Sequence, residues 1–169
     1  MKHHYLSTAL KMFVAAICLT AIGTSQAHAS DGKVYPGSMC VRWSGPTPTY
    51  NNSAIGNSGS TTLYVDCPAV HDSIAFGINN GWVKGVDRHF ASPITCSLLS
   101  LYPSGTGFAG WWTSPKSTTG GSATSPVETL TFGSLSSHST AHYYYSCQIP
   151  PTYAGYISYL MTYKVDENE

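Results

Sequence analysis

Acidic and imidazole side chains occur together at two places, in the pair His71-Asp72 and in the run Asp87-Arg88-His89. Groups of this kind perform the proton transfers of many hydrolases. Adjacent residues of a strand point to opposite faces, however, which separates His71 from Asp72 and favours a simple exposed or edge ion pair for Asp87 with Arg88. A small hydrolase that uses His71, Asp72, Asp87 and His89 is therefore kept as an alternative function.

No metal, cofactor or activated serine is indicated. His138 and His142 are four positions apart, but the Ser-rich residues around them and the following tyrosines favour a loop that enters a strand. We expect surface histidines there rather than metal ligands. No G-x-S-x-G motif marks a nucleophile, so no catalytic residue is assigned.

Aromatic residues give the better signal for binding. The chain has 12 Tyr and 4 Trp, and the consecutive Trp111-Trp112 of an extended segment must point in opposite directions, which leaves one ring exposed. An exposed ring near hydroxyl and amide groups can stack on a sugar, and it also suits a protein partner. Ligand-binding residues are predicted at Trp111, Trp112 and Tyr50. The alternative is that one Trp fills the core and the other covers a sheet edge; Trp43 and Trp82 are expected in the core.

The N-terminus resembles a secretory signal peptide. Lys2 and Lys11 precede an apolar run from Phe13 to Ile22, and Ala27-His28-Ala29 has the small residues of a cleavage site. The run is too short to cross a bilayer, which takes roughly 20 residues. We predict a signal peptide over residues 1–29, no membrane span after cleavage, and a location that is extracellular or periplasmic.

Cleavage leaves four cysteines in a chain bound for an oxidising compartment, where thiols pair. Four cysteines allow three pairings, and the sequence does not choose among them. If Met39–Ser44 neighbours Thr61–Cys67, and Ile94–Tyr102 neighbours His142–Ile149, the disulfides are Cys40–Cys67 and Cys96–Cys147. A zinc site needs closely spaced ligands, which these cysteines do not provide.

Short alternating runs separated by Gly, Pro, Asn and Ser indicate an all-β fold. The predicted class is a disulfide-stabilised, two-sheet antiparallel β-sandwich, jelly-roll-like or Ig-like, forming a single domain over residues 30–169. The expected strands are Met39–Ser44, Thr61–Cys67, Val70–Ile78, Trp82–Phe90, Ile94–Tyr102, Gly110–Thr113, Val127–Gly133, His142–Ile149 and Ile157–Val165.

Two hairpins and two long loops are expected. Asn79-Asn80-Gly81 is a turn signal between two strands, and the last two strands are read as a hairpin. In the last strand, one face should hold Ile157, Tyr159, Met161, Tyr163 and Val165. The segments Gly45–Ser60 and Ser114–Ser125 are predicted as loops.

Composition limits the partners. Only 9% of residues are charged and the formal net charge is zero. Such sparse charge does not favour nucleic acid or acidic lipid.

Three segments resemble a group of small, uncharacterised secreted bacterial proteins with four cysteines: Val34-Tyr35-Pro36-Gly37-Ser38-Met39-Cys40, Tyr64-Val65-Asp66-Cys67-Pro68 and Tyr145-Ser146-Cys147-Gln148-Ile149-Pro150-Pro151. The resemblance implies export, four paired cysteines and a bacterial source, and assigns no functional residue. The predicted function is a secreted, non-catalytic binding module, with glycan as the first candidate ligand and an extracellular protein as the second. The alternatives are the small hydrolase and a structural subunit of an envelope or surface assembly that pairs through exposed strand edges. The sequence leaves the oligomeric state open.

Overall fold

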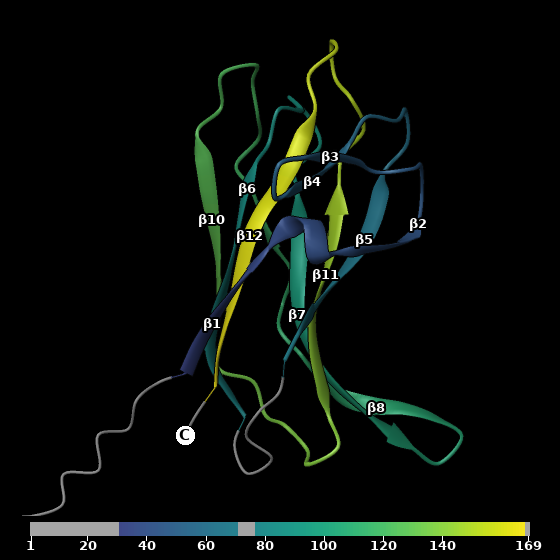
Figure 1. Cartoon of the computed structure of the whole chain (residues 1–169), viewed down its shortest axis with the longest axis vertical. Coiled ribbons are helices and arrows are strands. Elements are labelled where there is room, and N and C mark those ends of the chain that lie inside the picture. Colours follow the sequence, from purple (N-terminus) through teal and green to yellow (C-terminus); the bar gives the residue numbers. More distant parts are fainter. Residues whose placement is uncertain (1–30, 71–76, 168–169) are drawn as a thin grey trace, which may run out of the picture.

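The computed structural model describes residues 31–70 and 77–167 (Figure 1). The predicted signal peptide, His71 and Asp72 lie outside these ranges. Within them, no helix is long and apolar enough to cross a membrane. The elements are β1 Asp31–Pro36, the 3-10 helix η1 Gly37–Met39, β2 Val41–Ser44, β3 Thr49–Asn51, β4 Ala54–Asn57, β5 Leu63–Ala69, β6 Ile78–Val86, β7 Thr95–Ser104, β8 Gly107–Trp112, β9 Lys116–Ser117, β10 Val127–Phe132, β11 His142–Ile149 and β12 Ser158–Glu167.

The strands form two antiparallel sheets. Sheet A has the order β10-β6-β12-β4-β3, with β1 paired to β12 along the same edge as β4. Sheet B has the order β2-β5-β11-β7-β8, with β9 paired to β7. Figure 1 shows the two sheets as separate layers. The predicted two-sheet antiparallel β-sandwich is confirmed.

Alternation along each strand places the core between the sheets. On β11, every second side chain from Tyr143 to Ile149 is buried, and on β5 Leu63, Val65 and Cys67 are buried in the same alternation. Sheet A contributes buried residues such as Val83 and Phe132. The intervening side chains of both sheets form the two outer faces, which no further layer of the described residues covers.

Two tyrosines connect the sheets by hydrogen bonds in opposite directions. Tyr145 of sheet B donates its hydroxyl to the carbonyl of Lys164 at 2.6 Å, and Tyr163 of sheet A donates its hydroxyl to the carbonyl of Pro68 at 2.6 Å. Their rings meet edge to face, with centroids 5.8 Å apart. Burial raises the pKa of both hydroxyls far above the ordinary tyrosine value, so both remain neutral donors at physiological pH.

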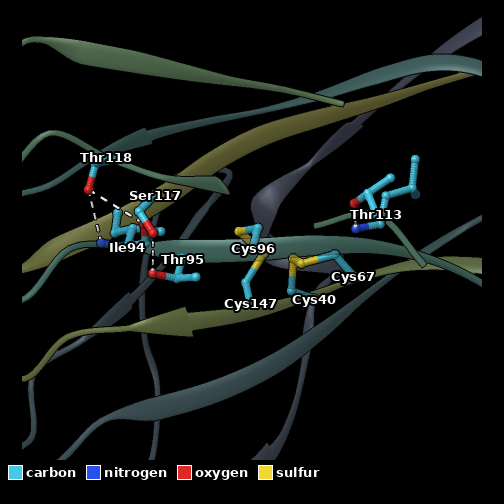
Figure 2. Close-up of a disulfide and its surroundings, with 10 residues drawn as sticks. Cys40, Cys67, Ile94, Thr95, Cys96, Thr113, Ser117, Thr118 and Cys147 are labelled. Atoms are coloured by element: carbon cyan, nitrogen blue, oxygen red, sulfur yellow. Dashed lines mark hydrogen bonds between the residues drawn. A yellow bond between two sulfur atoms is a disulfide. The ribbon is translucent and has the colours of Figure 1, made fainter. Parts of the chain in front are cut away.

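Both disulfides, Cys40–Cys67 and Cys96–Cys147, lie in sheet B, which is the pairing expected if the strands that carry them are neighbours (Figure 2). Cys96 and Cys147 are direct cross-strand partners of β7 and β11. Cys40 precedes β2 and bonds to Cys67 of the neighbouring β5. The pairing therefore follows from the two strand adjacencies on which the prediction depended.

The predicted turn at Asn79-Asn80-Gly81 is wrong, because these residues lie inside β6. A Cβ at Gly81 would clash with the Tyr145 hydroxyl, so the glycine allows a close approach between the sheets. Asn80 donates its side-chain amide to Asp166 of β12 at 2.9 Å. Asn80 and Gly81 are residue types that favour turns, but here they serve contacts with β12 and with the opposite sheet. Most of the other strand expected in this hairpin, Val70–Ile78, lies outside the described residues.

The predicted hairpin of the last two strands is also wrong, since β11 belongs to sheet B and β12 to sheet A. Asn57, fully buried on β4, donates its amide to the carbonyls of Ile149 at 3.0 Å and Pro150 at 2.9 Å. These bonds hold the end of β11 against sheet A, where the chain crosses between the layers.

The predicted inward face of the last strand is only half right. Ser158 and Leu160 are buried before an irregularity at Met161, whereas Tyr163 and Val165 are buried after it. A β-bulge adds one residue to the strand and therefore reverses which side chains face inward.

Both predicted loops contain strands. Gly45–Ser60 includes the hairpin β3–β4, and Ser114–Ser125 includes β9. Hydroxyl groups attach the second segment to β7: Thr95 and Ser117 share a hydrogen bond of 2.8 Å, and Thr118 accepts one of 3.0 Å from the Ile94 N–H (Figure 2). Polar side chains thereby replace the apolar contacts that usually hold a strand.

Candidate functional site

A groove of about 340 Å³ runs over the outer face of sheet B. Its floor comes from the outward-facing residues of the two central strands, which lie in register: Gln148 is opposite Thr95, and Ser146 is opposite Ser97. Its size falls in the range of small-molecule sites. The lining residues are Trp43, Tyr64, Thr95, Cys96, Ser97, Leu99, Trp112, Pro115, Ser146 and Gln148.

Aromatic side chains line this groove from both edges of the sheet. Trp43 of β2 lies beside Tyr64 of β5, with ring centroids 5.1 Å apart and planes tilted by 47°. Trp112 comes from β8, at the other edge. Trp43 is 59% exposed and Trp112 is 68% exposed. Exposed apolar side chains are common singly, but their clustering around a hollow is typical of binding surfaces.

The position of Trp112 follows from strand register. Trp112 pairs with Leu99, whose side chain faces outward, and Trp111 pairs with the buried Ser100. Thr113 continues this pairing, since its N–H donates to the Leu98 carbonyl and its hydroxyl accepts from the Leu98 N–H, both at 3.0 Å. The two indoles therefore point to opposite faces of β8, as expected.

Trp111 and Tyr50 lie away from this groove. Trp111, 38% exposed, packs near Tyr102 and borders a separate hollow beside Ser134 and Ser136. Tyr50 lies on β3, at the edge of the other sheet, and is 56% exposed. Of the three predicted ligand-binding residues, the structure places only Trp112 in the groove.

The expected core positions of Trp43 and Trp82 are wrong. Trp43 is on a short edge strand with an irregular register and faces the groove. Trp82 lies half-buried on the outer face of sheet A, where the Lys84 ammonium is 4.8 Å from its ring centroid. Both lie on outer faces that no other part of the described chain covers, so ring size alone did not predict burial.

The same outer face continues into a second hollow of about 430 Å³, lined mainly by apolar side chains such as Val41, Leu101 and Phe108. Asp66 lies on its border, opposite Ser146 in register. Burial raises the pKa of the Asp66 carboxyl, and a hydrogen bond from Ser146 partly opposes this shift. Its Oδ1 atom is buried and has no hydrogen-bond partner in the described part of the chain.

The predicted acid and imidazole groups do not form a catalytic arrangement among the described residues. Asp87 is fully buried instead of forming an exposed ion pair: its carboxylate accepts hydrogen bonds from the hydroxyls of Thr118 at 2.5 Å and Ser158 at 3.1 Å, and from the His89 backbone N–H at 2.9 Å. The His89 Nδ1 atom accepts the backbone N–H of Ser92 at 2.8 Å. These bonds fix the loop between β6 and β7. The positions of His71 and Asp72 lie outside the described residues.

No protein-family model and no curated protein matches the sequence. Among solved structures, the CBM36-1 domain of a multidomain xylanase from the hindgut metagenome of Trinervitermes trinervoides is similar, with 12% identity and a TM-score of 0.47, over 80% of this chain and 96% of that domain. A family two carbohydrate esterase from Cellvibrio japonicus matches with 8% identity and a TM-score of 0.44, over 82% of this chain and 34% of the esterase. Likenesses this distant concern the fold alone.

Several groove residues were missed by sequence reasoning, although a signal for them exists. Tyr64 of β5, and Ser146 and Gln148 of β11, lie on the outward sides of their strands, opposite the buried residues. An aromatic side chain on the polar half of an alternating strand is unusual for a surface that faces only water. That pattern, read on neighbouring strands, could have indicated Tyr64.

Proposed function

We propose that the protein is a secreted, non-catalytic β-sandwich module that binds a neutral carbohydrate chain in the groove of sheet B. The observation that carries this proposal is the combination of three aromatic rings, from Trp43, Tyr64 and Trp112, around a floor of hydroxyl and amide groups. The apolar faces of sugar rings stack on aromatic rings, while sugar hydroxyls need hydrogen-bond partners. The groove offers both.

Charge supports a neutral ligand. Among the described residues, no Asp, Glu, Lys or Arg lines the groove. A charged ligand would lose hydration there without gaining an opposite charge, whereas a neutral polyol exchanges water for Ser, Thr and Gln groups. The lining therefore favours uncharged sugars.

A binding role fits this groove better than hydrolysis. Glycoside hydrolysis generally uses two carboxyl groups roughly 5 to 10 Å apart across the scissile bond. The groove provides none, and Asp66 is a single carboxyl at the border of the neighbouring hollow. The predicted signal peptide and the two disulfides support a location outside the cytoplasm.

The test is affinity electrophoresis of the purified protein through gels that contain soluble neutral polysaccharides, followed by titration with oligosaccharides monitored by tryptophan fluorescence. We expect retention by at least one polysaccharide. Loss of an aromatic ring that carries much of the binding energy costs about 2 kcal/mol, so Trp112→Ala should weaken binding about 30-fold. Trp43→Ala should act in the same direction.

Phe90→Ala is the matched control. Phe90 is an exposed ring on the loop after β6, 73% exposed and packed near Tyr153, and it is outside the groove. Its removal should leave binding unchanged. Equal loss in the Phe90 and Trp112 variants, or retention by no polysaccharide in the panel, would contradict the proposal. Capture of an extracellular protein that depends on Trp112 would favour a protein ligand instead.

A further inference from the structure

Sheet A holds a second pocket, which the proposed function does not use. It has a volume of about 290 Å³ and lies between the β3–β4 turn and the ends of β6 and β12. Arg88 provides its charge, Asn51 and Asn52 provide amides, and Val86, Tyr159 and Met161 provide apolar walls. The pocket is on the outer face of sheet A, whereas the groove is on the outer face of sheet B.

Arg88 is held in place by its backbone but has an unused donor in its side chain. Its N–H donates to the Ser158 hydroxyl at 2.8 Å, and that hydroxyl in turn bonds to the buried Asp87. The guanidinium Nε is buried and has no hydrogen-bond partner among the described residues. A buried cationic donor without a partner is costly, and structures rarely retain one unless a ligand, ion or water completes it.

The two asparagines are positioned by a tight turn. Asn51 and Ala54 are paired at the end of the β3–β4 hairpin, and Asn52 adopts a positive φ of 53°, which asparagine tolerates. The Ser53 carbonyl accepts the Ser38 N–H at 2.8 Å, which anchors this turn to η1. The amide groups are therefore presented from an ordered turn.

The local charge favours an anion. No acidic residue is among those that line the pocket within the described ranges. Lys84 follows the same outward face of β6, and Lys164 on the neighbouring β12 pairs with Asp166 at 3.4 Å. The one charged side chain among the described residues that line the pocket, Arg88, is thus cationic, which favours an anionic group there.

We propose that this pocket binds the carboxylate of an acidic sugar, a uronate. The planar guanidinium matches a carboxylate in geometry and donates to it in parallel. Asn51 and Asn52 are placed to bond sugar hydroxyls, and the Tyr159 ring and Met161 provide a surface for the sugar ring. The site is separate from the groove, so one molecule would bind a neutral chain on one face and an acidic sugar on the other.

The test is an NMR titration with sodium glucuronate that follows the Nε–H signals of the two arginines, Arg42 and Arg88. We expect the Arg88 signal to shift with saturation and the Arg42 signal to stay in place. Loss of the charged hydrogen bonds in Arg88→Gln should weaken binding at least about tenfold. Arg42→Gln is the matched control, because Arg42 donates to the Gly45 carbonyl outside the pocket, and it should bind glucuronate like the unmodified protein.

Three results would overturn the inference. One is glucuronate binding by a folded Arg88→Gln variant with unchanged affinity. Another is binding of glucose, which lacks the carboxylate, with equal affinity. The third is equal affinity for inorganic sulfate, which would indicate a general anion site. The Trp112→Ala variant should bind glucuronate normally, and Arg88→Gln should bind neutral polysaccharide normally, so failure of either proposal can be told from failure of the other.

Discussion

The two sheets share one core but differ in how they are held and in what they present to solvent. Sheet B contains both disulfides, and its outer face carries exposed indoles above hydroxyl and amide groups. Sheet A contains no disulfide within the described residues, is irregular at Met161, and carries Lys84 and Arg88 on its outer face. Both disulfides thus lie in the sheet whose outer face carries the aromatic groove.

The difference shows how a two-layer fold separates its packed core from its solvent-facing surfaces. The inward halves of the strands must be apolar in both sheets, since they fill one core. The outward halves are free to differ, and here they differ in charge and in aromatic content. A groove on a sheet also needs strands that do not slide, and the Cys96–Cys147 cross-link fixes the register of β7 and β11 directly below the groove.

The largest expected effect is loss of that cross-link. In the loop-entropy model, removing Cys96–Cys147 with the double change Cys96→Ser and Cys147→Ser should lower the free energy of unfolding by about 4 kcal/mol, and removing Cys40–Cys67 by about 3.5 kcal/mol, because the second loop is shorter. Urea denaturation measures both. Native-state hydrogen exchange should show greater loss of protection in β7 and β11 than in β6 and β12. Uniform loss across both sheets would contradict a separate role for the cross-link in sheet B.

The core of sheet B could be predicted from the sequence because its signals are local. Alternation marks the inward face of β11 from Tyr143 to Ile149. The cysteine pairing was expected only if β2 lies next to β5 and β7 next to β11, an adjacency that the structure shows and the sequence left open. No bulge interrupts the pairing of β11 with β5 or with β7. Period-two reasoning is reliable under that condition.

Sheet A was predicted less well because its decisive contacts are long-range. The extra residue near Met161 reverses the inward face, and neither composition nor spacing indicates it. Position 81 needs a glycine because the Tyr145 hydroxyl approaches it from the opposite sheet. In the sequence, this glycine looks like part of a turn. The pocket at Arg88 combines residues from β3, β6 and β12, so only the folded chain shows it. Trp112 was predicted as a ligand-binding residue, and that role stays a prediction.

A smaller effect is expected from the hydrogen bonds between the sheets. Tyr163→Phe removes the hydroxyl that donates to the Pro68 carbonyl and leaves the ring in place, so the free energy of unfolding should fall by about 1 kcal/mol. Tyr50→Phe is the control, since Tyr50 is an exposed tyrosine of the same sheet, and it should change stability little. Equal stability of the two variants in urea would show that this connection contributes nothing measurable.

The smallest expected effect concerns Asp66, on the outer face of sheet B. Burial raises the pKa of this carboxyl in the folded protein above its ordinary value of 3.8, so the wild-type protein loses stability as pH rises through the folded pKa. Asp66→Asn has no such ionisation. The variant should therefore be more stable than wild type at pH 7, by a small amount because Asp66 is only partly buried, and this advantage should disappear below the ordinary pKa of 3.8.

Denaturation at a series of pH values checks this prediction, with Ser146→Ala as a companion. Ser146 donates a hydrogen bond that stabilises the charged carboxylate, so its removal should raise the pKa of Asp66 further and move the loss of stability to higher pH. An Asp66→Asn variant that is less stable than wild type at neutral pH would show that the charged form is favoured in the fold. In that case the hydrogen bond from Ser146 would outweigh the burial of the carboxylate, and Ser146→Ala should lose that stability at neutral pH.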